Sequence, residues 1–273
     1  MVSSISQNTY VYNGDEYRRR SKGEAELGAW VALAASGAIK AMLPSFSNPF
    51  LKQMSKEHGN NQLYKDVFQK AVNQQFFKDN GVNFVDTTFR YGEEALYRSK
   101  RPVVDGDIKA GFNACYIPSQ KIVKLNSEKA TISGFHELGH AMNHLQKGVG
   151  HVLQKLRGPG YTVAGLMGVL ALTSRPKPKE ADRNIADFIL DNSGKIAFIA
   201  MLPTVFEEAL ASYKGVKLAK SAGLTEPLLK NLRKFYGKAL LSYAGYALIT
   251  GVSVFATSKI MQGFTRPKKI EER

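Results

Sequence analysis

The chain has 273 residues, of which 44% are hydrophobic, enough for one large folded domain or two small ones. Its formal charge of +15 suggests a nucleic-acid partner, but the basic residues are scattered, without interleaved aromatic residues or a nucleic-acid motif, so we expect none. The single cysteine, Cys115, excludes an internal disulfide and a cysteine zinc site. Any bound zinc must therefore use histidine and carboxylate ligands.

The N-terminal part is predicted to contain a polar segment and one apolar helix. Residues 1–22 are polar, end in a basic cluster and lack the apolar core of a cleavable signal peptide, so we expect them to be poorly ordered. A hydrophobic helix is predicted over 23–44. Its charge-free part is too short to cross a bilayer unaided, and a spanning, a buried or an interfacial helix all remain open.

The middle of the chain alternates between helical and strand patterns. Apolar residues recur at helical spacing from 61 to 78, and Asn80-Gly81 is predicted to end that helix. Short strands are predicted at 82–85, 111–118 and 121–125, the last two joined by a turn at Pro118-Ser119.

Three more apolar runs follow, at 158–174, 196–206 and 239–258. The last run carries no charge, is long enough to span a bilayer, and is rich in small residues that suit close helix packing in lipid. Basic clusters outside several runs favour a membrane protein, whereas the mean hydropathy of −0.24 favours a large soluble helical domain. We expect an integral protein of a prokaryotic cytoplasmic membrane, with a soluble cytoplasmic protein as the alternative.

One motif carries chemistry. His136, Glu137 and His140 form H-E-x-x-H within an apolar helical pattern predicted to begin near Ser127 or Thr131. Histidines four residues apart lie on the same face of a helix, so both imidazoles can bind one zinc ion. The glutamate then lies close enough to handle a proton of an attacking water.

Such a site needs a third ligand. His144 lies one turn beyond His140, but three successive histidines at this spacing seldom converge on one ion, so it better suits a supporting contact or the surface. Glu207 and Glu208 emerge from an apolar stretch, where ionised carboxylates are costly unless they are paired or bound to metal. A glutamate is therefore the stronger candidate, and the choice between the two stays open at this point.

These blocks resemble the membrane-associated gluzincin peptidases, the group of HtpX and the CAAX prenyl endopeptidases. That family carries H-E-x-x-H and a downstream E-x-x-A-D, matched here by residues 136–140 and 208–211. The resemblance is weaker over the rest of 63–223, and the family's aspartate is replaced by Ser212. Metzincin peptidases are excluded because their third histidine is missing.

The resemblance implies a mainly α fold with a small β-sheet, that is, a gluzincin-like α+β catalytic domain, plus hydrophobic helices. It also implies roles for individual residues: zinc ligands His136, His140 and Glu208; the base Glu137; and a substrate edge strand at Asn113, Ala114 and Cys115. Apart from the resemblance, His144 is a candidate for a supporting contact, and His151 and Tyr213 are candidates for stabilising an oxyanion.

We therefore expect a membrane-associated zinc endopeptidase that acts on a protein or peptide. One alternative is a soluble zinc peptidase of the ImmA/IrrE type, which acts on a regulatory protein and whose motif also matches His144. Another is a non-catalytic membrane protein whose basic ends bind anionic lipid. The sequence does not indicate an oligomeric state.

The expected organisation has seven parts: a polar basic segment (1–22), a hydrophobic helix (23–44), the catalytic region (45–157), hydrophobic helices (158–206), a third-ligand helix region (207–238), a transmembrane helix (239–264) and a basic tail (265–273).

Overall fold

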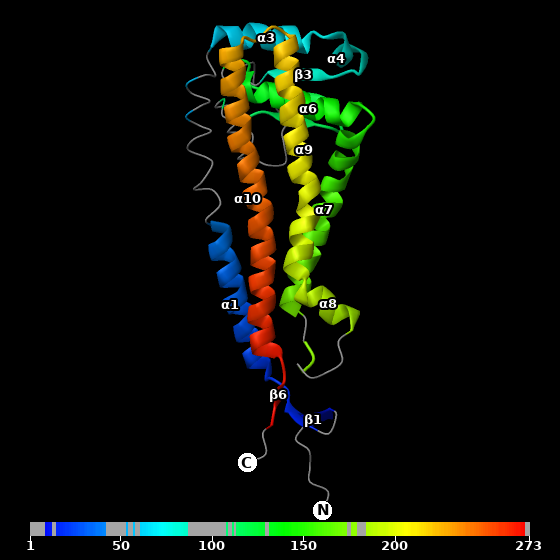
Figure 1. The fold of residues 1–273 in the computed structure, drawn as a ribbon, viewed down its shortest axis with the longest axis vertical. Helices are drawn as coiled ribbons and strands as arrows, with labels where there is room; N and C mark the ends of the chain where they lie inside the picture. Colours follow the sequence, from blue (N-terminus) through cyan, green and yellow to red (C-terminus); the bar gives the residue numbers. More distant parts are fainter. Residues whose placement is uncertain are drawn as a thin grey trace, which may run out of the picture. The chain divides into compact units, whose positions relative to one another are not determined.

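A computed structural model describes residues 9–12, 15–41, 61–86, 113–128, 131–173, 176–178 and 184–270, with the single residues 53, 57, 108 and 111. The protein is mainly helical with small sheets, which confirms the coarse fold prediction (Figure 1). Residues 175 and 179 of the basic cluster after the run 158–174, and the last three residues of the tail, lie outside the described residues.

The chain divides into two compact units. Unit 1 comprises Met1–Leu43, Gly158–Leu202 and Gly245–Arg273, and unit 2 comprises Pro44–Arg157 and Pro203–Ala244. Three long helices contribute residues to both units: α7 (Val149–Thr173), α9 (Ser193–Ser221) and α10 (Glu226–Thr265). The expected boundaries after residues 157, 206 and 238 therefore fall inside continuous helices.

Besides parts of these three helices, unit 2 contains α3 (Gln62–Val72), α4 (Gln75–Asp79), β3 (Asn83–Asp86), β4 (Cys115–Ile117), β5 (Ile122–Leu125) and α6 (Thr131–Leu145). The strands form a sheet in the order β3-β5-β4, in which β3 is parallel and β4 antiparallel to β5. The predicted turn between β4 and β5 is confirmed, and Lys121 closes it with a positive φ of 54°.

The helix predicted over 61–78 is two helices. Asn61 caps α3 by accepting a hydrogen bond from the Leu63 amide, and Asn73 ends it. A turn then begins α4 and allows Phe77 to enter the core, where it is 1% exposed. The apolar spacing alone did not indicate that the helix is interrupted between α3 and α4, and the buried position of Phe77 agrees with this interruption.

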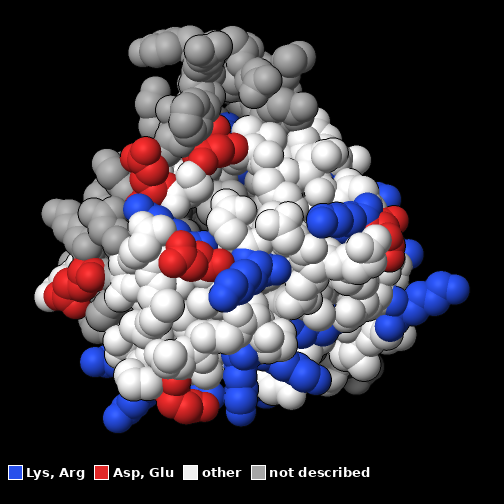
Figure 2. All heavy atoms as spheres, turned by 90° about the horizontal axis from the view of Figure 1, so that it is seen from above, with Lys and Arg blue, Asp and Glu red and all other residues white. Residues whose placement is uncertain are grey.

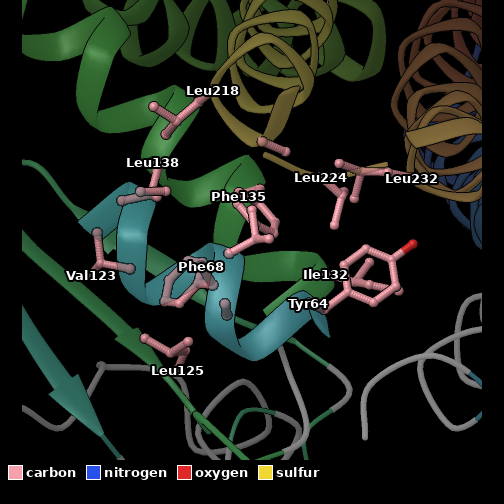
Figure 3. Packing of buried hydrophobic residues seen from close by; sticks show 14 of the residues in the cluster. Tyr64, Phe68, Val123, Leu125, Ile132, Phe135, Leu138, Leu218, Leu224 and Leu232 are labelled. Atoms are coloured by element: carbon pink, nitrogen blue, oxygen red, sulfur yellow. The ribbon is translucent and has the colours of Figure 1, made fainter. Parts of the chain in front are cut away.

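The core of unit 2 forms where α3 packs on α6. Figure 3 shows Phe68 of α3 beside Phe135 of α6, and their rings meet edge to face with centroids 5.3 Å apart. Leu138, Val123 and Leu232 complete the same cluster from α6, β5 and α10. This core fixes α6, the helix that carries the H-E-x-x-H motif.

Close backbone contact brings α9 onto α6. A Cβ added to Gly139 would lie 2.0 Å from the carbonyl oxygen of Ala211, and one added to Gly215 would lie 2.4 Å from that of Phe135. Only glycine permits this approach at either position. Because the two contacts are four residues apart on each helix, they hold one face of α9 against one face of α6.

Unit 1 contains β1 (Thr9–Tyr12), β2 (Asp15–Arg18), α1 (Lys22–Ala41), α8 (Ile185–Asp191) and β6 (Lys268–Lys269), together with the remaining parts of α7, α9 and α10. The strands form an antiparallel sheet in the order β1-β2-β6. The expectation of poor order is wrong for residues 9–12 and 15–22, because they form this hairpin and the start of α1.

The helices of unit 1 bury small residues and expose large apolar ones. Alanines lie inside, among them Ala32, Ala164, Ala197 and Ala247. Large apolar side chains face outward, among them Leu27, Trp30, Leu166, Val169, Leu248 and Phe255. Among the described residues, α9 and α10 are long and apolar enough to span a membrane, and only 33% and 22% of their most apolar segments is buried.

Candidate metal centre

Three side-chain atoms of unit 2 converge on one point. The Nε2 atoms of His136 and His140 lie 3.0 Å apart, and Glu208 Oε2 lies 3.0 Å from the first and 3.3 Å from the second. Ligands of a tetrahedral zinc ion, each about 2.1 Å from the metal, lie about 3.4 Å from one another. Two imidazoles and one carboxylate so arranged match the donors and the spacing of a zinc site.

Glu207 contacts the His140 ring at Nδ1, on the opposite edge from the Nε2 atom that faces His136. The His140 Nδ1–H donates to Glu207 Oε1 at 2.9 Å, and the Asn143 amide donates to the same oxygen at 2.9 Å. A proton on Nδ1 leaves the Nε2 lone pair of His140 free for a cation, and the carboxylate makes the ring more basic. The two adjacent glutamates thus take different positions: Glu208 at the point of convergence and Glu207 behind the ring.

Arg157 of α7 bridges the two glutamates. Its guanidinium donates to Glu207 Oε2 at 2.7 Å and to Glu208 Oε1 at 2.8 Å. This occupies one oxygen of Glu208 and leaves Oε2 directed at the histidines. Because Glu207 and Glu208 are 0% and 2% exposed, the guanidinium compensates carboxylates that would otherwise be buried at high cost.

Ser212 occupies the position at which the resembling family has aspartate. Its Oγ lies 3.1 Å from His136 Nδ1, within hydrogen-bonding distance. Ser212 is four residues after Glu208 and so lies on the same face of α9. The orienting contact therefore exists here, but with a neutral hydroxyl in place of a carboxylate.

Glu137 is held by a strand. The backbone N–H of Tyr116, in β4, donates to Glu137 Oε2 at 2.7 Å. Burial raises the pKa of the Glu137 carboxyl, an effect that the neighbouring His140 and His136 only partly offset. A carboxyl with a raised pKa beside a candidate metal site suits a group that takes up and releases a proton.

His140 attracts positive charge. Burial alone would lower its pKa, but the hydrogen bonds to Glu207 and Glu208 outweigh burial and raise the pKa to about 10. The cluster therefore stabilises a cation at the convergence point, either a proton on Nε2 or a metal ion.

His144 and His151 lie to one side of the cluster. His144 Nδ1 is 2.8 Å from the Tyr116 hydroxyl, and His151 Nδ1–H donates to the His144 carbonyl at 2.7 Å. Burial lowers the pKa of His144, which keeps it neutral. Since Tyr116 also holds Glu137 through its backbone, the two histidines support the strand that contacts Glu137.

Tyr213 faces away from these contacts. It is 64% exposed, and its place directly after Ser212 turns it about 100° around α9 from that residue. Tyr243 of α10, which sequence reasoning missed, interacts with Glu208 instead.

An outer strand, β4, begins at Cys115, so Asn113 and Ala114 of the predicted substrate edge directly precede it. Among the described residues β4 is an outer strand of its sheet, Ala114 is buried, and the Ala114 amide donates to Asn113 Oδ1 at 2.9 Å. Cys115 pairs with Lys124 of β5. The structure thus brings together the predicted His136, His140, Glu208 and Glu137, with β4 alongside.

Arg157, Asn143 and Tyr243 could not be found from motif spacing. Arg157 did leave one signal, since it stands directly before the uncharged run 158–174. On the face drawn in Figure 2, Lys and Arg side chains are separated by uncharged and acidic ones. Comparisons with protein-family models, curated proteins and solved structures found no match.

Proposed function

We propose that the protein is a zinc-dependent endopeptidase of the gluzincin type, associated with a membrane. The observation that carries this proposal is the convergence of His136 Nε2, His140 Nε2 and Glu208 Oε2 at 3.0–3.3 Å, beside the Glu137 carboxylate. A buried hydrogen-bonded cluster without metal would also explain the burial and the charges, with an N–H···N bond between the two imidazoles. The feature that favours a metal is the third donor, because Glu208 Oε2 is directed at the same point as both nitrogens.

Zinc held by His136, His140 and Glu208 would lower the pKa of a water and polarise the scissile carbonyl. Glu137 accepts the proton of the attacking water and passes it to the leaving nitrogen, a role that its raised pKa favours. The Tyr116 amide keeps the carboxylate of Glu137 in place during both transfers. Tyr243, next to Glu208, is the candidate for stabilising the developing oxyanion.

The outer edge of β4 supports a peptide substrate. An extended chain can pair with the backbone of such an edge, and the paired segment then lies beside Glu137, which β4 itself holds. Backbone pairing depends little on side chains, so we expect protein substrates to be selected by access to the site rather than by a strict sequence.

Metal content tests the zinc proposal directly. We expect one zinc per purified chain, retained in Glu137→Gln but lost in His136→Ala and Glu208→Ala. Glu207→Gln should keep zinc with about 10–100-fold weaker affinity, because Glu207 only orients His140. His144→Ala is the matched histidine control and should keep it fully.

Peptidase activity separates catalysis from metal binding. Glu137→Gln should abolish cleavage of an unstructured protein substrate while zinc remains bound. Zinc retained in both ligand variants would exclude the assigned ligands, and cleavage that survives Glu137→Gln would exclude the base.

The membrane part of the proposal rests on unit 1, whose large apolar side chains point outward. Trp30, the only tryptophan, is 72% exposed on α1 and reports directly on its surroundings. In phosphatidylcholine vesicles its fluorescence should be quenched by lipids brominated on the acyl chains and protected from aqueous iodide. Iodide quenching without lipid quenching would favour the soluble alternative.

A further inference from the structure

Two neighbouring cavities lie in unit 1 where α1 begins and α10 ends. Their volumes are about 420 Å³ and 450 Å³, and Arg20 and Pro267 line both. Figure 1 shows β1 and β6, the strands that flank these helix ends, in the same region. Neither cavity belongs to the candidate metal centre, which lies in unit 2.

The lining of both cavities is strongly basic. The first is lined by Arg19, Arg20, Lys22 and Lys177, and the second by Arg20, Lys259, Arg266, Lys268 and Lys269. No acidic side chain lines either one among the described residues. Gathering this many like charges is unfavourable unless an anion neutralises them.

Folding accounts for only some of these cations. Arg20 pairs with Glu24 at 2.6 Å and donates to the Arg266 and Gly263 carbonyls, so it closes the end of α10. Lys259 lies 3.7 Å from Asp191. These residues have structural partners and need no ligand.

Three exposed lysines of the same lining have no comparable role. Lys22 makes only a loose contact with Glu26, at 3.6 Å between two exposed side chains. Lys177 and Lys268 form no ion pair with any residue that the structure describes. Their ammonium groups are therefore free to bind an anion supplied from outside.

The location of the cavities identifies the anion. The basic residues directly precede the outward apolar side chains of α1, such as Leu27 and Trp30, and follow the charge-free part of α10. In a bilayer, the phosphates of lipids lie at the ends of apolar helices, where basic residues attract them.

We propose that these two cavities bind the phosphate headgroup of an anionic phospholipid. The inference rests on the membrane location proposed above, but not on the zinc chemistry. Each lysine near an anionic surface contributes up to about fivefold in affinity, and screening of exposed charges reduces this, so we expect about a tenfold overall preference for anionic over neutral lipid.

Trp30 provides the measurement. The full chain in phosphatidylcholine vesicles is titrated with acyl-brominated phosphatidylglycerol or with acyl-brominated phosphatidylcholine, and the two quenching curves give the preference for the anionic lipid. The Lys22→Gln/Lys177→Gln/Lys268→Gln variant should reduce that preference to about twofold or less. The matched control, Lys70→Gln/Lys78→Gln/Lys230→Gln in unit 2, removes the same charge from exposed positions and should leave the preference unchanged.

Each outcome decides one point. Equal quenching by both lipids in the wild type overturns the headgroup site alone, whereas quenching by neither overturns the membrane location as well. An equal loss in the control variant shows that net charge, rather than these cavities, attracts the lipid. Inorganic phosphate in excess, at constant ionic strength, should not change the preference; if it abolishes it, the cavities take free phosphate instead of lipid.

Discussion

The two units place their apolar residues in opposite ways. Unit 2 buries large side chains such as Phe135 and Leu232 around α6 and keeps a network of charged side chains inside, in which Arg157 pairs with Glu207 and Glu208. Unit 1 buries alanines and turns Trp30 and Leu166 outward. Burial of large apolar side chains is the rule for a protein in water, whereas outward apolar side chains on long helices are what the proposed membrane location of unit 1 predicts. This contrast is the feature that distinguishes the proposed membrane protein from a wholly soluble one.

The same substitution in each unit gives the sharpest test of this contrast. Leu232→Ala removes a fully buried side chain of unit 2 and should cost about 2–5 kcal/mol of unfolding free energy. Leu166→Ala in unit 1, where the side chain is 56% exposed, should change it by less than about 0.5 kcal/mol. Both values come from urea unfolding in one detergent. Equal costs would mean that unit 1 has a water-type core.

Breaking the charged network tests the interior of unit 2. Arg157→Met leaves Glu207 and Glu208 buried without their guanidinium partner and should cost about 3 kcal/mol. Added zinc should recover part of this loss by supplying positive charge. Lys155→Met, an exposed cation two residues earlier on α7, should have little effect. A small effect of Arg157→Met, measured by unfolding with and without chelator, would contradict the proposed compensation.

The contact between α6 and α9 tests how the ligands are assembled. Gly139→Ala forces a methyl group against the Ala211 carbonyl and should cost about 1–3 kcal/mol and weaken zinc binding. Gly158→Ala on α7 meets nothing within 4 Å and should be neutral or slightly stabilising. Competition with a chelator measures the first effect, and thermal unfolding measures both. Unchanged zinc affinity in Gly139→Ala would separate the ligands from the helix contact.

The smallest expected effect lies in unit 1, at the start of α1. The Ser21 amide and the Arg20 guanidinium lower the pKa of Glu24 to about 2. The pKa of Glu24 in the folded protein is lower than the ordinary value of 4.5. The ionised carboxylate therefore adds to the free energy of unfolding above pH 4.5, and this stabilisation is lost as the pH falls toward 2. The stability difference between wild type and Glu24→Gln, followed by circular dichroism, should shrink over that range. A difference that stays constant would exclude the interaction.

The sequence predicted the structure best where the spacing of residues within one short segment determines its helix, strand or turn. The H-E-x-x-H helix, the strands β4 and β5 and the turn between them follow from spacing and turn residues. The division of roles between Glu207 and Glu208 did not, because it depends on which face of α9 meets α6. Arg157 and Asn143 were missed for the same reason, since they reach the cluster across helix contacts that no spacing encodes.

The N-terminal hairpin was missed despite a local signal. The sequence between β1 and β2 is Asn13-Gly14, a pair typical of two-residue hairpin loops. The polar composition of the segment outweighed that signal in the prediction. The strands are short, and β2 gains a second partner only from β6, more than 200 residues away in the sequence.

The Arg157 bridge has a consequence for ion selection. When ionised, the carboxylates of Glu137, Glu207 and Glu208 outnumber the single guanidinium by two negative charges. A divalent cation makes this pocket electroneutral, whereas a monovalent ion leaves it negative and a trivalent ion leaves it positive. Without such a cation, neutrality requires protons, which agrees with the raised pKa values of Glu137 and His140. Uptake of the metal should therefore expel protons into the solvent, so that acidity and metal compete for the same pocket.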